Sequence, residues 1–253
     1  MRRHLLVIGG QRCGTTSLAR LLDAHPEITM ARPPRPEPKV FCSDEATDRG
    51  LDWYRRTWFA HARDERLLGD KSTSYIEDPA APGRAARMLG EAEVVALLRD
   101  PVERAVSNWR FSTDHGLEDR PLERALEENL AGESPQTPAT TSVSPFAYLE
   151  RGRYADHLRP WLCRFPATRI VLLADLLARP AETSDRLFEQ LGVRTGLTTA
   201  TPALNASHSP TAELSPRLLR RLRDYFADSD AELAARLGHE LPWRTGAPTG
   251  STR

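Results

Sequence analysis

Apolar and polar residues follow one repeated order along the chain, in which a short apolar run precedes a longer amphipathic segment. The runs at 5–8, 94–98 and 169–174 are short and mostly apolar, as are strands buried on both faces. The segments that follow them carry apolar residues at helical spacing. Strands that alternate with helices predict an α/β fold, in which helices cover both faces of a central parallel sheet.

Helical spacing and capping residues predict where the helices lie. In 15–24, apolar residues share one face, and a His-Pro pair ends the helix. After the second apolar run, Asp100 is a suitable N-cap and Pro101 fits the first helical position. The same spacing predicts further helices at 51–59, 79–89, 153–165, 181–192 and within 215–238.

Proline and glycine interrupt the regular pattern in three places. Segment 31–41 holds four prolines, which exclude a helix or a central strand and predict an ordered loop or a linker. Segment 66–75 is expected to form a short strand that breaks at Gly69. Segment 132–145 is rich in Pro, Ser and Thr, which is typical of a mobile surface loop.

Composition sets limits on size and partners. The chain has 253 residues, 40% of them apolar, so we expect one domain over 1–243 and a frayed tail over 244–253. The 35 basic and 35 acidic residues balance, so charge gives no reason to expect a nucleic acid or an anionic membrane as partner. Only Lys39 and Lys71 are lysines among the 35 basic residues, which makes each of them more informative than usual.

Cysteine and histidine positions favour a reducing compartment and no metal site. Cys13, Cys42 and Cys163 lie far apart without a C-x-x-C pair, and no two of the seven histidines have metal-binding helical spacing. The first apolar run is too short for a signal peptide, and no run of about 18 apolar residues occurs. We therefore expect a cytoplasmic protein without a membrane anchor.

A glycine-rich loop joins the first apolar run to the first helix. Gly9 and Gly14 have the spacing of a Walker A loop, but Thr15 stands where that loop has its lysine. Such a loop presents backbone N–H groups and the positive end of a helix to an anion. A tight turn whose glycines serve only packing is the alternative. The missing lysine and the lack of a suitable magnesium-binding acid argue against ATP or GTP hydrolysis.

Two motifs carry a resemblance to a known family. Residues 9–28, GGQRCGTTSLARLLDAHPEI, resemble the first motif of sulfotransferases that use 3′-phosphoadenosine 5′-phosphosulfate (PAPS), in the branch of heparan sulfate sulfotransferases and their bacterial relatives. Residues 97–109, LLRDPVERAVSNW, are similar to the second motif of that family. The likeness continues in order over nearly the whole chain. It implies a P-loop-like three-layer domain, in which the first motif holds the 5′-phosphosulfate and the second the 3′-phosphate.

The resemblance implies which residues bind the donor. Arg12 stands where many members have lysine, and it would contact the 5′-phosphate and the bridging oxygen of the leaving group. Arg99 and Ser107 match the arginine and serine that bind the 3′-phosphate. The remaining contacts to PAPS are expected from Gln11, Cys13, Gly14, Thr15, Thr16, Ser17, Asn205 and Ser207.

The resemblance also implies two catalytic side chains besides Arg12. Residues 36–41, PEPKVF, resemble the pattern K-E-P-H-F-F, in which Glu37 would take the proton of the acceptor hydroxyl. Pro36 and Lys39 depart from that pattern. Lys71 matches the lysine of E-K-[ST]-P-[SA]-Y and would neutralise charge on the transferring sulfuryl group. A solvated glutamate in a linker and an exposed charge at a strand end are the alternatives for these two residues.

The function implied is transfer of a sulfuryl group from PAPS to a hydroxyl or, second in order, an amine. The acceptor would be a small molecule, glycolipid or saccharide, a role in secondary metabolism is expected, and no metal is required. A P-loop small-molecule kinase and a non-catalytic nucleotide-binding protein of the same fold are the alternatives. The residues indicate neither the acceptor nor the oligomeric state.

Overall fold

The computed structural model describes residues 2–135, 144–197 and 214–245. The chain divides into two compact units, each of which is described by itself. We name them the sheet unit, Met1–Leu98 with His157–Leu204, and the helical unit, Arg99–Asp156 with Asn205–Arg253. The single domain expected over 1–243 stays a prediction.

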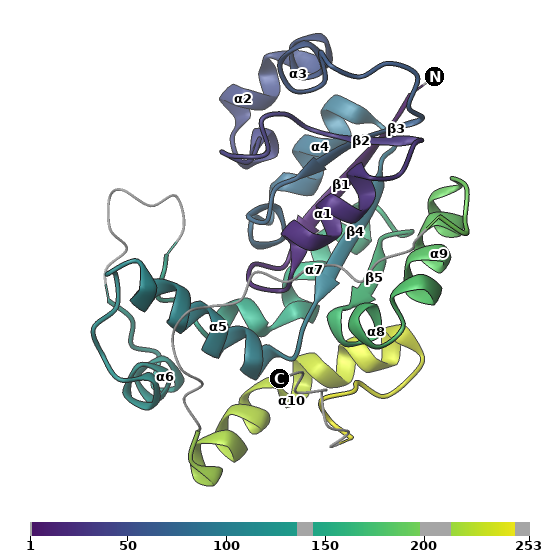
Figure 1. Ribbon diagram of the computed structural model, residues 1–253. Coiled ribbons are helices and arrows are strands. Elements are labelled where there is room, and N and C mark those ends of the chain that lie inside the picture. The colour runs from purple at the N-terminus through teal and green to yellow at the C-terminus, as the bar shows by residue number, and fades with distance from the viewer. Residues whose placement is uncertain (1, 136–143, 198–213, 246–253) are drawn as a thin grey trace. The chain divides into compact units, whose positions relative to one another are not determined.

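The sheet unit is built on a sheet whose described strands are all parallel. The strands are β1 (Arg3–Gly9), β2 (Ile28–Met30), β3 (Leu67–Lys71), β4 (Glu93–Leu98) and β5 (Arg169–Leu172). Their order across the sheet is β2-β3-β1-β4-β5 (Figure 1), so β1 lies at the centre. Each neighbouring pair is parallel, with Val7 of β1 opposite both Lys71 of β3 and Val95 of β4. The prediction of a central parallel sheet is confirmed.

The helices follow the strands as the apolar pattern predicts. Those of the sheet unit are α1 (Thr15–Asp23), α2 (Asp44–Asp48), α3 (Gly50–Trp58), α4 (Ala81–Leu89), α8 (Leu173–Ala178) and α9 (Pro180–Leu191), together with most of α7 (Tyr154–Arg164). The short 3₁₀ helices η1 (Val40–Cys42) and η2 (Tyr75–Glu77) belong to it as well. The helical unit holds α5 (Pro101–Asp114), α6 (Leu122–Leu130), η3 (Glu150–Gly152) and α10 (Pro216–Leu237).

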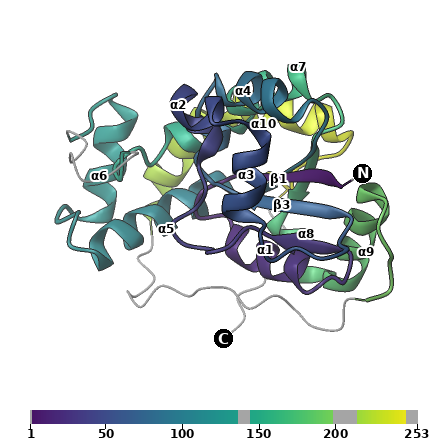
Figure 2. The ribbon, with the colours of Figure 1, turned by 90° about the horizontal axis from the view of Figure 1, so that it is seen from above.

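Helices cover both faces of the sheet and give the sheet unit three layers. Leu18 of α1, Leu176 of α8 and Leu187 of α9 pack with Leu5 and Val95 of the strands in one buried cluster. Figure 2 shows α1, α8 and α9 on this side of the strands and α4 and α7 on the other. The burial of both faces explains why the strands read as continuous apolar runs.

Three boundaries differ from the sequence prediction. β3 continues through Gly69 instead of breaking there, because the glycine leaves room for the side chain of Met30, which a Cβ atom would displace. β5 ends at Leu172, and the apolar residues after it begin α8. One helix, α10, accounts for the helices predicted within 215–238. The short strand β2 was not predicted, since a three-residue strand leaves almost no periodic signal, and the helices α2 and α6 were not predicted either.

The helical unit has its own apolar core between α5, α6 and α10. Leu126 of α6, Leu222 and Phe226 of α10 and Tyr148 are fully buried in it. The predicted cap of α5 is confirmed, since the carboxylate of Asp100 accepts the N–H of Val102 at 2.9 Å. The start of α5 is therefore defined by local hydrogen bonding as well as by packing.

Candidate functional site

The residues expected to do chemistry follow strands of one parallel sheet. β1 ends at Gly9 and leads into residues 9–16, which we name the glycine loop. β3 ends at Lys71, and β2 is followed by the proline segment, residues 31–41, which contains Glu37. Because the carboxyl ends of parallel strands meet at one edge, all three segments begin at the edge where ligands bind in open α/β sheets.

The glycine loop ends in a helix start suited to an anion. Gly14 has φ of 88° and stands at the N-cap of α1, where no side chain caps the helix and no acidic residue lies in the first turn. Among the described residues, no hydrogen bond engages the N–H groups of Gly14, Thr15 and Thr16. These donors and the helix dipole together favour a bound anion.

The first half of the loop is held by backbone contacts and a buried side chain. Gly10 donates its N–H to the carbonyl of Leu97 at 2.8 Å, and Cys13 donates its N–H to Gly10 at 3.2 Å. The Cys13 thiol is fully buried and lies 3.6 Å from the carbonyl of Gln11. Arg12 has φ of 63°, a left-handed conformation that is uncommon outside glycine. The loop is thus a folded element with Arg12 at its turn.

Close packing joins the glycine loop to the segment after β3. A Cβ atom at Gly9 would lie 2.5 Å from Cγ2 of Ile76 and 3.3 Å from the carbonyl oxygen of Thr73. The N–H of Ser72 also donates to the carbonyl of Val7 at 3.2 Å. Residues 72–76 therefore cross directly over the end of β1, which brings Thr73 beside the first residue of the loop.

Glu37 and Lys71 form an ion pair next to this crossing. Nζ of Lys71 donates to Oε1 of Glu37 at 2.5 Å, and the two side chains are only 11% and 17% exposed. The other carboxylate oxygen, Oε2, accepts the N–H of Thr73 at 2.9 Å and its hydroxyl at 3.0 Å. Both carboxylate oxygens of Glu37 thus accept hydrogen bonds. Glu37 is therefore not a solvated linker residue, and Lys71 is not an exposed charge at a strand end.

Asp70 lies fully buried beside Lys71 and holds a network of hydroxyl groups. Its Oδ2 accepts the hydroxyls of Tyr54 at 3.0 Å and Tyr75 at 2.7 Å, and its Oδ1 accepts the hydroxyl of Ser72 at 2.8 Å. Burial raises the pKa of Asp70 to about 6, although the three hydroxyl donors act to lower it. Burial also raises the pKa of Tyr54 and of Tyr75.

Two of these hydroxyl groups also accept hydrogen bonds from the backbone of the proline segment. Oγ of Ser72 accepts the N–H of Lys39 at 2.9 Å, and the hydroxyl oxygen of Tyr75 accepts the N–H of Phe41 at 3.5 Å. Lys39 and Phe41, at the end of the proline segment, are therefore linked to Asp70 through the hydroxyl groups of Ser72 and Tyr75. Lys39 lies two residues after Glu37. Sequence reasoning passed over this role of Asp70, although a carboxylate inside a strand buried on both faces requires partners and is itself a signal.

Arg99 and Ser107 belong to the helical unit. Arg99 follows β4 directly, and its Nε donates to Glu103 at 3.0 Å with the side chain 31% exposed. Ser107 lies on α5, one helical turn after Glu103, so that the two share a face. Asn205 and Ser207 lie outside the described residues.

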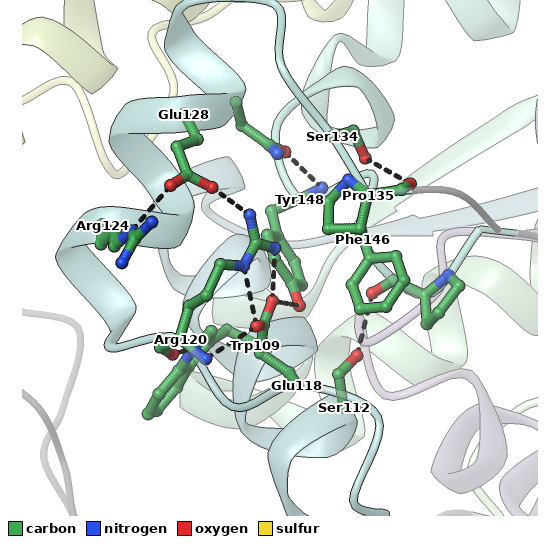
Figure 3. Close-up of polar contacts among 12 residues, drawn as sticks. Trp109, Ser112, Glu118, Arg120, Arg124, Glu128, Ser134, Pro135, Phe146 and Tyr148 are labelled. Atoms are coloured by element: carbon green, nitrogen blue, oxygen red, sulfur yellow. Dashed lines mark hydrogen bonds and ion pairs between the residues drawn. The ribbon is translucent and has the colours of Figure 1, made fainter. Parts of the chain in front are cut away.

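A second charged cluster of the helical unit holds two loops together. Glu118, whose side chain is 1% exposed, accepts hydrogen bonds from Arg120 and from the hydroxyl of Tyr148. Arg120 also pairs with Glu128 of α6, as Figure 3 shows. Since each charge faces an opposite one, the cluster serves to anchor the chain on both sides of α6.

Neither a metal site nor a membrane span is found in the described ranges. Among the described residues, no group of histidine, cysteine, aspartate and glutamate side chains could hold a metal ion. Within the same ranges, no helix combines the length and apolar character needed to cross a bilayer.

Comparison with known proteins supplies the family. The family model described as a sulfotransferase domain matches residues 2–209. The human bifunctional heparan sulfate N-deacetylase/N-sulfotransferase 3 is 30% identical over 194 residues, which are 74% of this chain and 22% of that protein. The human heparan sulfate glucosamine 3-O-sulfotransferase 3B1 is 26% identical over 262 residues, covering 94% of this chain and 64% of the relative. This chain thus spans less than two thirds of either relative.

A solved structure matches the fold over almost its full length. The crystal structure of a sulfotransferase from Alicyclobacillus acidocaldarius superposes with a TM-score of 0.75 and 25% sequence identity. The match covers 96% of this chain and 99% of that one. The predicted P-loop-like α/β architecture is confirmed by this likeness together with the parallel sheet.

Proposed function

This chain belongs to the sulfotransferase domain family, and on that basis we propose that it transfers a sulfuryl group from PAPS to an acceptor hydroxyl. An amine is the second candidate acceptor. The observation that carries the proposal is the pairing of an anion-binding helix start with the Glu37–Lys71 pair at one edge of the sheet. The first suits the phosphosulfate of the donor and the second suits proton and charge transfer.

The glycine loop fits the 5′ end of the donor. The N–H groups of Gly14, Thr15 and Thr16 would bind the 5′-phosphate, and Arg12 would add the positive charge that the absent Walker lysine supplies elsewhere. Gln11 and Cys13 of the loop and Ser17 of α1 would complete the contacts around that phosphate. Arg99 and Ser107, with Asn205 or Ser207, are proposed contacts of the 3′-phosphate and the nucleotide on the basis of the second motif.

Glu37 and Lys71 would act on the acceptor side. The carboxylate of Glu37 accepts the acceptor proton as the acceptor oxygen bonds to sulfur, and the bond from sulfur to the leaving phosphate oxygen breaks. Lys71, released from Glu37 by that protonation, neutralises the charge on the sulfuryl oxygens. The donor supplies the sulfuryl group, and no metal is required in this scheme.

The acceptor is proposed as a small molecule, a glycolipid or a saccharide of secondary metabolism, and the location as cytoplasmic. Both human relatives carry heparan sulfate in their names, which supports a saccharide among these classes. The neutral overall charge gives no support to nucleic acid as a partner.

Calorimetric binding of adenosine 3′,5′-bisphosphate (PAP), the donor product, tests the proposal. We expect PAP to bind without magnesium at micromolar concentration, and ADP and ATP to bind at least about tenfold more weakly. Arg99→Ala should remove the preference for PAP, since it removes the expected partner of the 3′-phosphate. Equal binding of PAP and ADP, or a preference for Mg-ATP, would contradict the proposal and favour a P-loop kinase. Binding of PAP without sulfuryl transfer in a broad acceptor screen would favour a non-catalytic protein.

A further inference from the structure

The side chain of Arg99 is held in a way that leaves part of its guanidinium group available. Among the described residues, its only hydrogen-bond partner is Glu103, which accepts from Nε at 3.0 Å. The two terminal nitrogens, Nη1 and Nη2, form the end of the planar fork that binds phosphate in a bidentate manner. Whether they meet a phosphate depends on where the backbone of Arg99 is fixed.

Arg223 of α10 holds Asp100, the residue that follows Arg99 in the chain. Its Nη1 and Nη2 donate to the two carboxylate oxygens of Asp100, at 2.7 and 2.6 Å. Asp100 is 6% exposed and also caps α5 through the N–H of Val102. One carboxylate therefore joins α10 to the start of α5, and the bidentate geometry defines both distance and orientation.

Tyr154 holds the peptide unit between Arg99 and Asp100. Its hydroxyl donates to the carbonyl oxygen of Arg99 at 2.8 Å, and the residue is 1% exposed. Close packing supports the same arrangement, because Gly152 leaves room for both Phe226 and Pro101, which a Cβ atom would approach to 2.7 and 2.9 Å. The backbone just after the Arg99 Cα atom is thus held at the Arg99 carbonyl by Tyr154 and at the Asp100 side chain by Arg223.

Arg223 also balances local negative charge. Burial acts to lower the pKa of Arg223, but its hydrogen bonds to Asp100 and the attraction of nearby carboxylates together raise it. The carboxylates of Glu103 and Asp230 add to the same effect. Without Arg223, three acidic side chains would surround the start of α5 with less compensation, which disfavours a phosphate dianion nearby.

We propose that Arg223, acting through Asp100, positions Arg99 for the 3′-phosphate of the donor and thereby sets the selectivity for 3′-phosphorylated nucleotides. Tyr154 supports the same position through the carbonyl of Arg99. This inference rests on the proposed function. Arg223 is a positioning residue, since it acts on the ligand only through its neighbours.

Calorimetry with PAP and with adenosine 5′-monophosphate (AMP), which lacks only the 3′-phosphate, tests this role. Arg223→Ala is expected to raise the dissociation constant of PAP at least about tenfold and to leave that of AMP within about twofold. Arg223→Lys keeps the charge without the bidentate fork, and it should raise the constant of PAP about threefold to tenfold. Arg221→Ala is the matched control, because Arg221 lies on the same helix and pairs with Glu127 at 3.4 Å instead.

The possible outcomes distinguish failure of this inference from failure of the proposed function on which it rests. If the unmodified protein binds PAP no more tightly than AMP, the proposed donor site fails. If it prefers PAP and both Arg223 variants keep that preference, the positioning role is wrong. An equal loss for PAP and AMP would show a general structural role and would also overturn the inference. Where Arg223→Ala does not fold, the ratio measured with Arg223→Lys decides.

Discussion

At Glu37, three hydrogen bonds hold both carboxylate oxygens in a half-buried position, which is where a base must be held before an acceptor arrives. We predict that Glu37→Gln lowers sulfuryl transfer by about 10²-fold or more, because the amide cannot take a proton. The affinity for PAP should stay within about threefold of the unmodified protein, since the proposed donor contacts lie elsewhere. Release of PAP in the presence of an acceptor and calorimetry measure the two quantities.

Glu45→Gln provides the control for that substitution. Glu45 is an exposed glutamate in the first turn of α2, so its replacement should change neither transfer nor binding. A Glu37→Gln protein with undiminished transfer would exclude Glu37 as the base.

Asp70 should give the protein a distinctive dependence of stability on pH. Its pKa is raised by burial from 3.8 to about 6, so between these values the folded protein binds a proton that the unfolded chain has released. Stability from this group is therefore present below about pH 4 and is lost as the pH rises to about 6. Between pH 4 and 7, the free energy of unfolding of the unmodified protein should fall by about 2 kcal/mol relative to Asp70→Asn.

Urea unfolding of both proteins across that pH range measures the difference. The comparison cancels the other titrating groups that both proteins share. A constant difference from pH 4 to 7 would mean that Asp70 does not titrate in this range in the folded state.

The sequence could indicate residue types for the site, but only some of their partners. Glu37 and Lys71 are 34 positions apart, and their resemblance to family motifs assigned roles to each without saying that they form an ion pair. Their pairing depends on β2 and β3 lying side by side, and β2 is too short to be recognised from periodicity. The network of Asp70 depends on the same contact between distant segments.

Among the elements, the crossing of residues 72–76 over the end of β1 is the most constrained. Gly9 has φ of 155°, and a side chain there would meet Ile76. We predict that Gly9→Ala destabilises the protein by about 1–3 kcal/mol, because both the backbone conformation and the close contact oppose a Cβ atom. Thermal or urea unfolding measures the loss.

A second substitution separates the two causes. Ile76→Ala removes Cγ2, the side-chain atom nearest to the new Cβ, so the cost of Gly9→Ala should be smaller in an Ile76→Ala background. The remaining cost reports the backbone conformation together with the contacts to Cβ of residue 76 and the carbonyl oxygen of Thr73. The same cost in both backgrounds would mean that the contact with Ile76 does not constrain Gly9.

The regular elements were predictable where one physical signal dominated. The N-cap of Asp100 and the proline after it located the start of α5 to the residue, because capping is a local interaction. The end of β5 was misplaced, since Leu173 and its neighbours are buried in α8 as they would be in a strand. Burial alone does not distinguish the two states over so few residues.

At the scale of the whole molecule, the parallel sheet was predictable from three apolar runs, but the order of its strands was not. The central place of β1 between β3 and β4 follows from long-range pairing, which no local pattern encodes. The division into a sheet unit and a helical unit could not be predicted from the sequence either, because the chain leaves the sheet unit after Leu98 and returns to it at His157.

That interrupted path has a consequence for the growing chain on the ribosome. Translation releases about 5–20 residues each second, so β4 emerges several seconds before β5, the strand that covers its outer edge. Throughout this interval the apolar residues 94–98 present an unpaired edge, and such edges readily pair with other chains. The nascent protein is therefore most prone to misassembly while the segment from Arg99 to Asp156 is being made. Chaperones that bind apolar strands would act during this interval.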